Sequence, residues 1–416
     1  MHEIEWLAPP SLRGQKSSQS DTRKRTEIFY EFLYYLFDSF LIPLIRSNFY
    51  VTESSTDKYR LFFFRHDVWR YVAEPAMAAL KTKMFEEVKT EDALRILEAR
   101  QLGFSQVRLL PKQTSMRPIM NLRRRTAIRG KQRVLGPSIN SILGPVNSVL
   151  KLEKVSSLPS HANCEIKADE TVPKALNPSR LGASMFSVGD IYQRIKAFKS
   201  RLGPGPHNNL FFAKIDVQAA FDTIPQDAII TLLNQIPQHV QYALLKHVEI
   251  AMSDATGPKS VARPYKRWHI TALAAAAATE RNGGGVRAQP SFPDRVEQSL
   301  ALKRRDTVFV DSAVRRTLKA RDILALAAEH IAQNLVRIGK KYYRQKEGIP
   351  QGSVLSSMLC SWFYADLERR RLGFLLESED CLLMRLIDDF LLITTDRGKA
   401  ERFVEVMTAG VPEYGV

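Results

Sequence analysis

The stretch LLMRLIDDFLLITT, at Leu382–Thr395, decides the fold of this chain. It places two adjacent aspartates, Asp388 and Asp389, between two apolar runs, which predicts a strand, a two-residue turn and a second strand. Two like charges at the tip of an apolar hairpin repel each other and lose part of their hydration. Because that arrangement is unfavourable without a neutralising cation, the pattern indicates a cation site at the turn.

A third aspartate ends another apolar strand far upstream. The segment LFFAKID, at Leu210–Asp216, predicts a buried strand that ends in Asp216. Carboxylate oxygens suit Mg²⁺, and two such ions about 3.5–4 Å apart stabilise the attacking and leaving oxygens of phosphoryl transfer. We therefore expect Asp216, Asp388 and Asp389 to be catalytic and to hold two Mg²⁺ ions at a site that exists only in the fold.

Each part of this pattern alone has a simpler interpretation. An isolated Asp-Asp pair is more often a solvated turn or a helix cap, and Asp216 by itself could cap the end of a strand. The apolar runs on both sides of Asp388 and Asp389 argue against a solvated turn. The decision rests on the other motifs in the chain.

One such motif is a basic stretch. Gln101–Val134 contains no Asp or Glu, and within it VRLLPK and MRPIMNL predict two short strands around a tight turn. Lys112 and Arg117 lie five residues apart there and could hold the charge of a triphosphate. A general nucleic-acid-facing patch explains the same residues equally well.

A second motif is the turn EGIPQGS, at Glu347–Ser353, which predicts the start of a helix that runs through Leu367. Its glycines, with Gly352 next to Gln351, would let the backbone approach a base pair closely. An ordinary turn before a helix is compatible with that interpretation.

The composition is consistent with a nucleic-acid partner. The chain has 416 residues, enough for two or three domains, and its 61 Lys and Arg against 44 Asp and Glu give a formal charge of +17. Such an excess favours a polyanionic partner, nucleic acid first and an anionic membrane second. The three cysteines, Cys164, Cys360 and Cys381, are far apart, which argues against disulfides or a zinc site and favours a reducing compartment.

The amino-terminal region predicts no membrane contact. Residues 1–28 are polar and are interpreted as a solvated leader, in preference to a nuclear-import signal, and no secretory signal is present. Residues 29–45 are apolar but contain Glu31, Asp38 and Pro43. We therefore expect a core helix that is too short and too polar to span a bilayer.

Periodicity predicts the remaining elements. Two aromatic runs, Asn48–Ser54 and Tyr59–Trp69, predict a hairpin, and residues 70–102 predict helix. Residues 252–300 lack periodicity and predict a surface insertion with a flexible loop, whereas residues 311–339 predict helix.

Taken in order, these segments resemble a known family. AKIDVQAAFDTIPQ, EGIPQGSVLSSMLCSWFYADLE and LIDDFLLIT resemble motifs A, B and C of reverse transcriptases. NFYVTES with RLFFFRHDVW resembles the T motif of telomerase reverse transcriptases, and RLLPKQTSMRPIMNL resembles their motifs 1 and 2. LGASMFSVGDIYQRIK resembles the segment ahead of motif A, and the long stretch between motifs A and B resembles the telomerase insertion in the fingers.

The resemblance implies roles for individual residues. Asp216, Asp388 and Asp389 would bind the metals, with Asp389 the least direct ligand. The nucleotide-binding residues would be Lys112 and Arg117 on the phosphates, Phe221 beneath the sugar to exclude a 2′-hydroxyl, and Gln351 and Gly352 lining the pocket. For Phe221, simple core packing is the alternative. Phe49, Tyr50 and Arg65 would bind RNA by stacking and charge.

The resemblance also implies a fold and a domain order. We expect an α+β chain with reverse-transcriptase fingers and palm around an antiparallel palm sheet, preceded by part of a helical RNA-binding domain. The expected boundaries are a leader at 1–28, the RNA-binding part with its T motif at 29–95, and fingers and palm at 96–416, with the insertion at about 226–335. Family members continue beyond the counterpart of Val416 with a motif D lysine, a primer grip and a thumb. We therefore expect a form truncated at both ends, with weak or no activity alone.

The function implied is an RNA-directed DNA polymerase that adds telomeric repeats to chromosome 3′ ends in the nucleus, at the telomere. Its cofactor would be Mg²⁺, as two ions. Its partners would be telomerase RNA, telomeric single-stranded DNA, dNTPs and accessory telomere proteins, with no membrane. The alternatives are a non-catalytic RNA-binding fragment of the same family and a retroelement reverse transcriptase.

Overall fold

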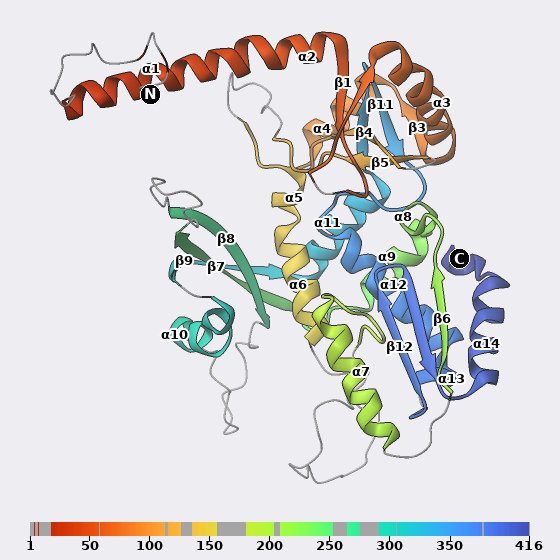
Figure 1. The fold of residues 1–416 in the computed structure, drawn as a ribbon. Helices are drawn as coiled ribbons and strands as arrows, with labels where there is room; N and C mark the ends of the chain where they lie inside the picture. Colours follow the sequence, from red (N-terminus) through yellow and green to blue (C-terminus); the bar gives the residue numbers. More distant parts are fainter. Residues whose placement is uncertain are drawn as a thin grey trace. The chain divides into compact units, whose positions relative to one another are not determined.

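The computed structural model describes residues 4, 7, 18–57, 59–112, 115–125, 135–155, 180–203, 209–252, 264–274, 291–304, 306–376 and 378–415 (Figure 1). Cys164, most of the expected leader, and residues 253–263 and 275–290 of the expected insertion lie outside these residues. The chain divides into two compact units. The first comprises Met1–Lys81 with Arg108–Ile119, and the second comprises Thr82–Val107 with Met120–Val416.

The first unit begins with a continuous helix. Its pieces are α1 (Gln19–Tyr34), the π-helical η1 (Tyr35–Leu41) and α2 (Ile42–Asn48). No residue in these three pieces is buried, so the expected core helix is wrong for the described structure. The expectation that this segment is too short and too polar to span a bilayer is also wrong, because the helix Gln19–Asn48, at 30 residues, is long and apolar enough to do so. A single helix of this kind near an N-terminus is only weak evidence of a membrane span. The expectation of no membrane partner stays a prediction.

The expected aromatic hairpin is confirmed in the first unit. Strands β1 (Phe49–Glu53) and β2 (Leu61–Arg65) pair antiparallel and lead into α3 (His66–Met84). The ring of Tyr50 stacks on Trp69 of α3, with ring centroids 4.1 Å apart. Because side chains alternate along a strand, one face of this hairpin packs on α3 and the other faces outward.

The second unit contains the palm sheet. Three antiparallel strands lie in the order β12 (Cys381–Leu386), β13 (Asp389–Thr394) and β6 (Phe211–Asp216), which confirms the strands expected around both aspartate motifs. One face packs on α7 (Gly189–Leu202) through a cluster that includes Phe198 and Met384. The other packs on α12 (Ser356–Arg371), where the ring of Phe390 lies 6.0 Å from that of Tyr364.

Short elements surround the palm sheet in the second unit. The chain reaches it through α5 (Ile139–Ile142) and α6 (Gly144–Val155), and leaves β6 through α8 (Ala220–Thr223) and α9 (Gln226–Asn234). After α12 come α13 (Gly373–Leu376), α14 (Arg397–Thr408) and the 3-10 turn η4 (Pro412–Tyr414), with α14 packed on β6 and β13.

A five-stranded sheet has the order β3-β11-β10-β4-β5. Its strands are β3 (Phe85–Val88), β11 (Lys341–Gln345), β10 (Leu335–Ile338), β4 (Ser105–Pro111) and β5 (Met116–Met120). The strands β4 and β5 confirm the pair expected in the basic stretch. The helix expected over 70–102 is wrong in part, since α3 and α4 (Thr90–Ala99) are separated by β3, whose residues pair with β11.

A third sheet corrects two further expectations. Strand β7 (Gln241–Met252) pairs with β8 (Pro264–Ala274) and with β9 (Thr307–Lys319), all antiparallel. Strand β8 therefore lies within the insertion expected at 252–300, and β9 occupies the start of the helix expected at 311–339. Both expectations are wrong there because these strands form by long-range pairing. Helix α11 (Ala320–Ala332) begins only after β9, and α10 (Phe292–Arg295), η2 (Val296–Leu300) and η3 (Ala301–Lys303) precede it.

Helix α11 carries a buried histidine. His330 is 1% exposed, and its Nε2 lies 2.9 Å from Ser353 Oγ. Burial, with a smaller contribution from Arg100, lowers the pKa of His330 to about 3. His330 therefore binds a proton much less readily in the folded chain than in the unfolded chain.

We expect stability to fall as the pH drops from about 6.5 towards 3, because the unfolded chain then binds a proton that folded His330 does not. One group contributes a slope of at most about 1.4 kcal/mol per pH unit. The free energy of unfolding of His330→Gln, measured by urea denaturation between the two pH values, should change less per pH unit than that of the parent chain. An unchanged slope would contradict the assignment.

Candidate active site

The fold brings the three predicted aspartates together. Asp389 pairs with Asp216 across β13 and β6, and Asp388 lies in the turn that precedes β13. One carboxylate oxygen from each residue lies within 4.8 Å of the others. Residues 172 positions apart therefore share one site, with Asp216 exposed and the other two half-buried.

The turn at the tip of the hairpin has a strained backbone. Ile387 adopts a φ of 61°, in the left-handed region that β-branched residues disfavour. The amide of Val217, just after β6, donates to the carbonyl of Asp388 at 3.3 Å. This strain and this contact fix the direction in which Asp388 leaves the turn.

A buried arginine supports the same turn. The guanidinium of Arg385 is fully buried, and its Nη1 donates to the carbonyl of Ile387 at 3.0 Å. Its Nη2 donates to the carbonyl of Ser361 on α12 at 3.0 Å, and its Nε donates to the carboxylate of Glu368. One side chain therefore ties the strained turn to the helix beneath it.

The partner carboxylate is equally buried and has a second donor. Glu368 Oε2 accepts from the amide of Ala183 at 2.8 Å. The preceding Gly182 has a φ of 56°, and a Cβ there would lie 2.0 Å from the same oxygen. Only glycine fits at this position. The ion pair therefore holds the backbone at Gly182 and Ala183, ahead of motif A, against β12.

A lysine lies at the edge of the aspartate cluster. Lys214 Nζ is 3.2 Å from Asp389 Oδ1, and both side chains are partly exposed. The ammonium competes with any metal ion for that carboxylate. Metal binding by the three aspartates, with direct ligation expected least of Asp389, stays a prediction.

Two buried acids lie beneath the hairpin and remain protonated. Burial, opposed in part by Arg385 and aided by the nearby Asp388, raises the pKa of the Cys360 thiol to about 12. Burial also raises the pKa of Tyr364 far above its ordinary value, with added effects from Cys360 and Asp388. Because neither group ionises at neutral pH, the negative charge of the site comes from the carboxylates.

The predicted nucleotide-pocket residues of the second unit lie next to one another. Phe221, on α8, is half-buried, and its carbonyl accepts from the amide of Ile349 at 2.7 Å. Gln351 Nε2 donates to Asp222 Oδ1 at 2.7 Å. Gly352 has a φ of 104°, and a Cβ there would lie 2.6 Å from the carbonyl of Met120. The glycine is thus required by close packing within the chain, and a nucleotide role for these residues stays a prediction.

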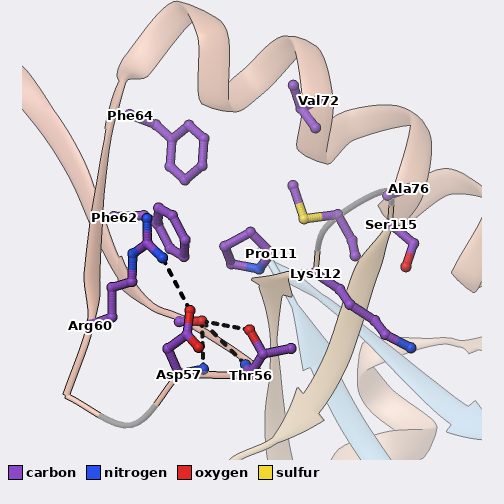
Figure 2. Close-up of a pocket in the computed structure, with 12 residues that line it drawn as sticks. Thr56, Asp57, Arg60, Phe62, Phe64, Val72, Ala76, Pro111, Lys112 and Ser115 are labelled. Carbon is purple, nitrogen blue, oxygen red and sulfur yellow. Dashed lines mark hydrogen bonds and ion pairs between the residues drawn. The ribbon is translucent and has the colours of Figure 1, made fainter.

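Lys112 and Arg117 belong to the first unit, at the ends of β4 and β5, and both are exposed. Lys112 also lines a pocket of about 780 Å³ within that unit, together with aromatic residues of β2 (Figure 2). Arg60 borders this pocket and donates to Asp57 at 3.2 Å. The fold places the two predicted cations on one hairpin, and a phosphate-binding role stays a prediction.

The three predicted RNA contacts lie on different faces of the first hairpin. Tyr50 faces α3 and stacks on Trp69, so one face of its ring is already used. Phe49 is 38% exposed, and the opposite residue Arg65 donates to Asp67 at 2.8 Å. Phe49 and Arg65 are accessible together, whereas Tyr50 has a structural contact.

Sequence reasoning missed Arg385, Glu368 and Lys214. Arg385 stands inside the apolar run LLMRLI, and a charge within a buried strand signals a buried partner. That signal was available, but nothing local identifies Glu368, which lies on another element, as the partner.

An antiparallel palm sheet that joins three aspartates at one hairpin, with fingers elements around it, defines the reverse-transcriptase class of nucleic-acid polymerase fold. Residues 1–80 match the family model described as "Telomerase ribonucleoprotein complex - RNA binding domain". The chain is 32% identical over 407 residues to telomerase reverse transcriptase of Canis lupus familiaris, covering 95% of this chain and 33% of that protein. The Bos taurus protein is 30% identical over 422 residues, covering 100% of this chain and 34% of that protein.

Solved structures agree on the fold. Telomerase from Candida albicans, in complex with the TWJ fragment of telomeric RNA, has a TM-score of 0.61 at 20% identity over 97% of this chain and 54% of that one. Apo telomerase from Candida tropicalis has a TM-score of 0.61 at 19% identity over 97% of this chain and 56% of that one. The chain belongs to the telomerase reverse transcriptase family and spans about a third of the length of the curated relatives named above.

Replacement of Arg385 by Met should cost about 3–5 kcal/mol of unfolding free energy, because it leaves the Glu368 carboxylate buried without its cation. Arg397→Met is the matched control, since that arginine pairs with Glu401 on the surface of α14. The control should lose less than about 1 kcal/mol. Equal losses in urea denaturation would show that burial of the pair has no special role.

Proposed function

We propose that this chain is the nucleotidyl-transfer part of an RNA-directed DNA polymerase that adds telomeric repeats to chromosome 3′ ends. A bound RNA would serve as the template, and the reaction would take place in the nucleus at the telomere. The convergence of Asp216, Asp388 and Asp389 at one hairpin is the observation that supports the chemistry. Membership of the telomerase reverse transcriptase family supports the choice of template and product.

The donor set fits Mg²⁺. Three carboxylates supply hard oxygen ligands within 4.8 Å of one another, at a site open to substrate on the side of exposed Asp216. Two bound Mg²⁺ ions supply Lewis-acid stabilisation of the attacking and leaving oxygens when a DNA 3′-hydroxyl displaces pyrophosphate from a dNTP. A carboxylate cluster of this kind has no need of thiol or imidazole ligands.

The chain's own side chains would hold this site in one geometry. Arg385 orients the turn through the carbonyl of Ile387, so Asp388 keeps its direction without a rearrangement. Lys214 partly neutralises Asp389 and limits the repulsion among the three carboxylates.

Nucleotide contacts are proposed for Phe221, Gln351 and Gly352 in the second unit. Phe221 is only half-buried, which is consistent with a ring that faces the sugar of a dNTP and excludes a 2′-hydroxyl. Lys112 and Arg117 would bind the triphosphate charge.

RNA contacts are proposed for the first unit. Its residues 1–80 match the RNA-binding family model, and Phe49 and Arg65 present an aromatic ring and a cation on one face. The proposed partners are telomerase RNA, telomeric single-stranded DNA and accessory telomere proteins. A non-catalytic RNA-binding role is the second candidate, and the same match at residues 1–80 supports it.

Primer extension tests the catalytic proposal. The purified chain, given an RNA–DNA template-primer, dNTPs and Mg²⁺, should incorporate label weakly, as expected for a truncated form, and Asp388→Ala should lower that incorporation at least about a hundredfold by removing a proposed metal ligand. Asp227→Ala, an exposed aspartate of α9, is the control and should retain activity.

Two outcomes would count against polymerase activity. Incorporation that survives Asp388→Ala would mean that another protein in the preparation produced it. Binding of RNA without any incorporation by the parent chain would favour the non-catalytic alternative.

Phe221→Ala should relax sugar selection. With the ring removed, a 2′-hydroxyl no longer meets a steric barrier, so incorporation of rNTPs relative to dNTPs should rise about tenfold or more. The ratio is measured by competing the two nucleotides in the same extension reaction. An unchanged ratio would indicate that Phe221 only packs in the core.

A further inference from the structure

The sheet β8-β7-β9 has two unlike faces. On one face, His247 stacks on His269, and its ring lies 6.1 Å from Phe292 of α10. On the other face, Ser148 of α6 donates to the carbonyl of Ile270, and Gly144 abuts the Ile270 side chain. Helix α6 thus covers only the part of that face near Ile270.

Part of the second face is exposed, although Val248 in its middle is buried. We define the Trp268 face as five side chains that the strand register places on one side of the sheet: Lys266 and Trp268 of β8, Lys246 of β7, and Val308 and Val310 of β9. The side chain of Trp268 is 58% exposed, that of Val308 61% and that of Val310 43%. A large aromatic ring and aliphatic side chains beside it are exposed among the described residues.

The charge on the Trp268 face has one sign. Lys246 and Lys266 lie on this side, and Lys246 Nζ is 4.3 Å from the centroid of the Trp268 ring. The acidic residues of the three strands, Glu249 and Asp311, pair in register with residues of the opposite face. A cation held over one side of an indole leaves the other side open for a second planar group.

We propose that the Trp268 face binds single-stranded DNA, with a base stacked on Trp268 and phosphates near Lys246 and Lys266. Exposed aromatic rings beside cations are the pattern of sheets that bind single strands without strict sequence preference. The proposal rests on the proposed function only for the identity of the strand, which would be the DNA being extended.

The chemistry of this face favours DNA over RNA. Apart from the ammonium groups of Lys246 and Lys266, the register places no exposed hydrogen-bonding side chain of the three strands beside Trp268, so a 2′-hydroxyl gains few partners there. Burial of that hydroxyl against Val308 or Val310 costs free energy. The deoxyribose backbone avoids this cost.

Photocrosslinking tests the contact directly. An oligodeoxythymidylate containing 5-iododeoxyuridine is irradiated with the full chain, without Mg²⁺ or nucleotide, and the crosslinked peptides are mapped by mass spectrometry. A crosslink at Trp268 is expected. Its absence from the mapped peptides would overturn the proposal.

Equilibrium binding of a labelled oligodeoxythymidylate provides the second measurement. Trp268→Ala should weaken affinity about tenfold, and Trp268→Phe should restore much of it, since a smaller ring still stacks. Tyr265→Ala, on the opposite face and 36% exposed, is the matched control and should bind as the parent does. Lys246→Gln and Lys266→Gln should each lower the salt slope by roughly 0.7.

The outcomes separate this proposal from the catalytic one. Asp388→Ala should bind DNA normally, so a chain that fails in primer extension can still confirm the Trp268 face. Unchanged DNA affinity in Trp268→Ala would overturn the proposal and leave the face to a protein partner. An oligoribonucleotide whose affinity depends on Trp268 as strongly as that of DNA would overturn the choice of DNA.

Discussion

Electrostatic repulsion among three carboxylates is the constraint on which the palm region of this molecule depends. Asp216, Asp388 and Asp389 place oxygens within 4.8 Å of one another, which no flexible loop would tolerate. Two of them are held by the pairing of β13 with β6, and the third by a turn whose backbone is strained at Ile387. The rigidity of the sheet is therefore what permits a cluster of negative charge that attracts divalent cations.

That rigidity comes from beneath the sheet. The buried pair of Arg385 and Glu368 joins the hairpin tip, helix α12 and the segment at Gly182 through hydrogen bonds to backbone carbonyl and amide groups. A buried ion pair is weak evidence for added stability, because desolvation offsets most of the attraction. The pair instead orients the groups around it, because the two guanidinium nitrogens and the second carboxylate oxygen each bond to one backbone group. The pair positions the turn, and the turn positions Asp388.

Two small sheets away from the aspartates, β1-β2 and β8-β7-β9, each pack one face against a helix and expose side chains on the other. In the first unit, Tyr50 packs on α3 while Phe49 and Arg65 face outward. In the third sheet, His247 lies on the side of α10 while Trp268 is exposed beside two lysines. Both outward faces combine aromatic rings with cations, which is consistent with an excess of positive charge across the whole chain.

The sequence by itself determined the palm strands, the aspartate hairpin, the aromatic hairpin and the three aspartates that come together. Each of these has a local signal, such as apolar runs that end in acids. It did not determine strand β8 or the start of β9, because their pairing with β7 is long-range and their composition is weakly patterned. Only the tertiary structure decided that Arg385 meets Glu368, that Lys214 meets Asp389, and that Tyr50 is used in packing. Partners of this kind are set by how separate elements pack, which no short window of residues contains.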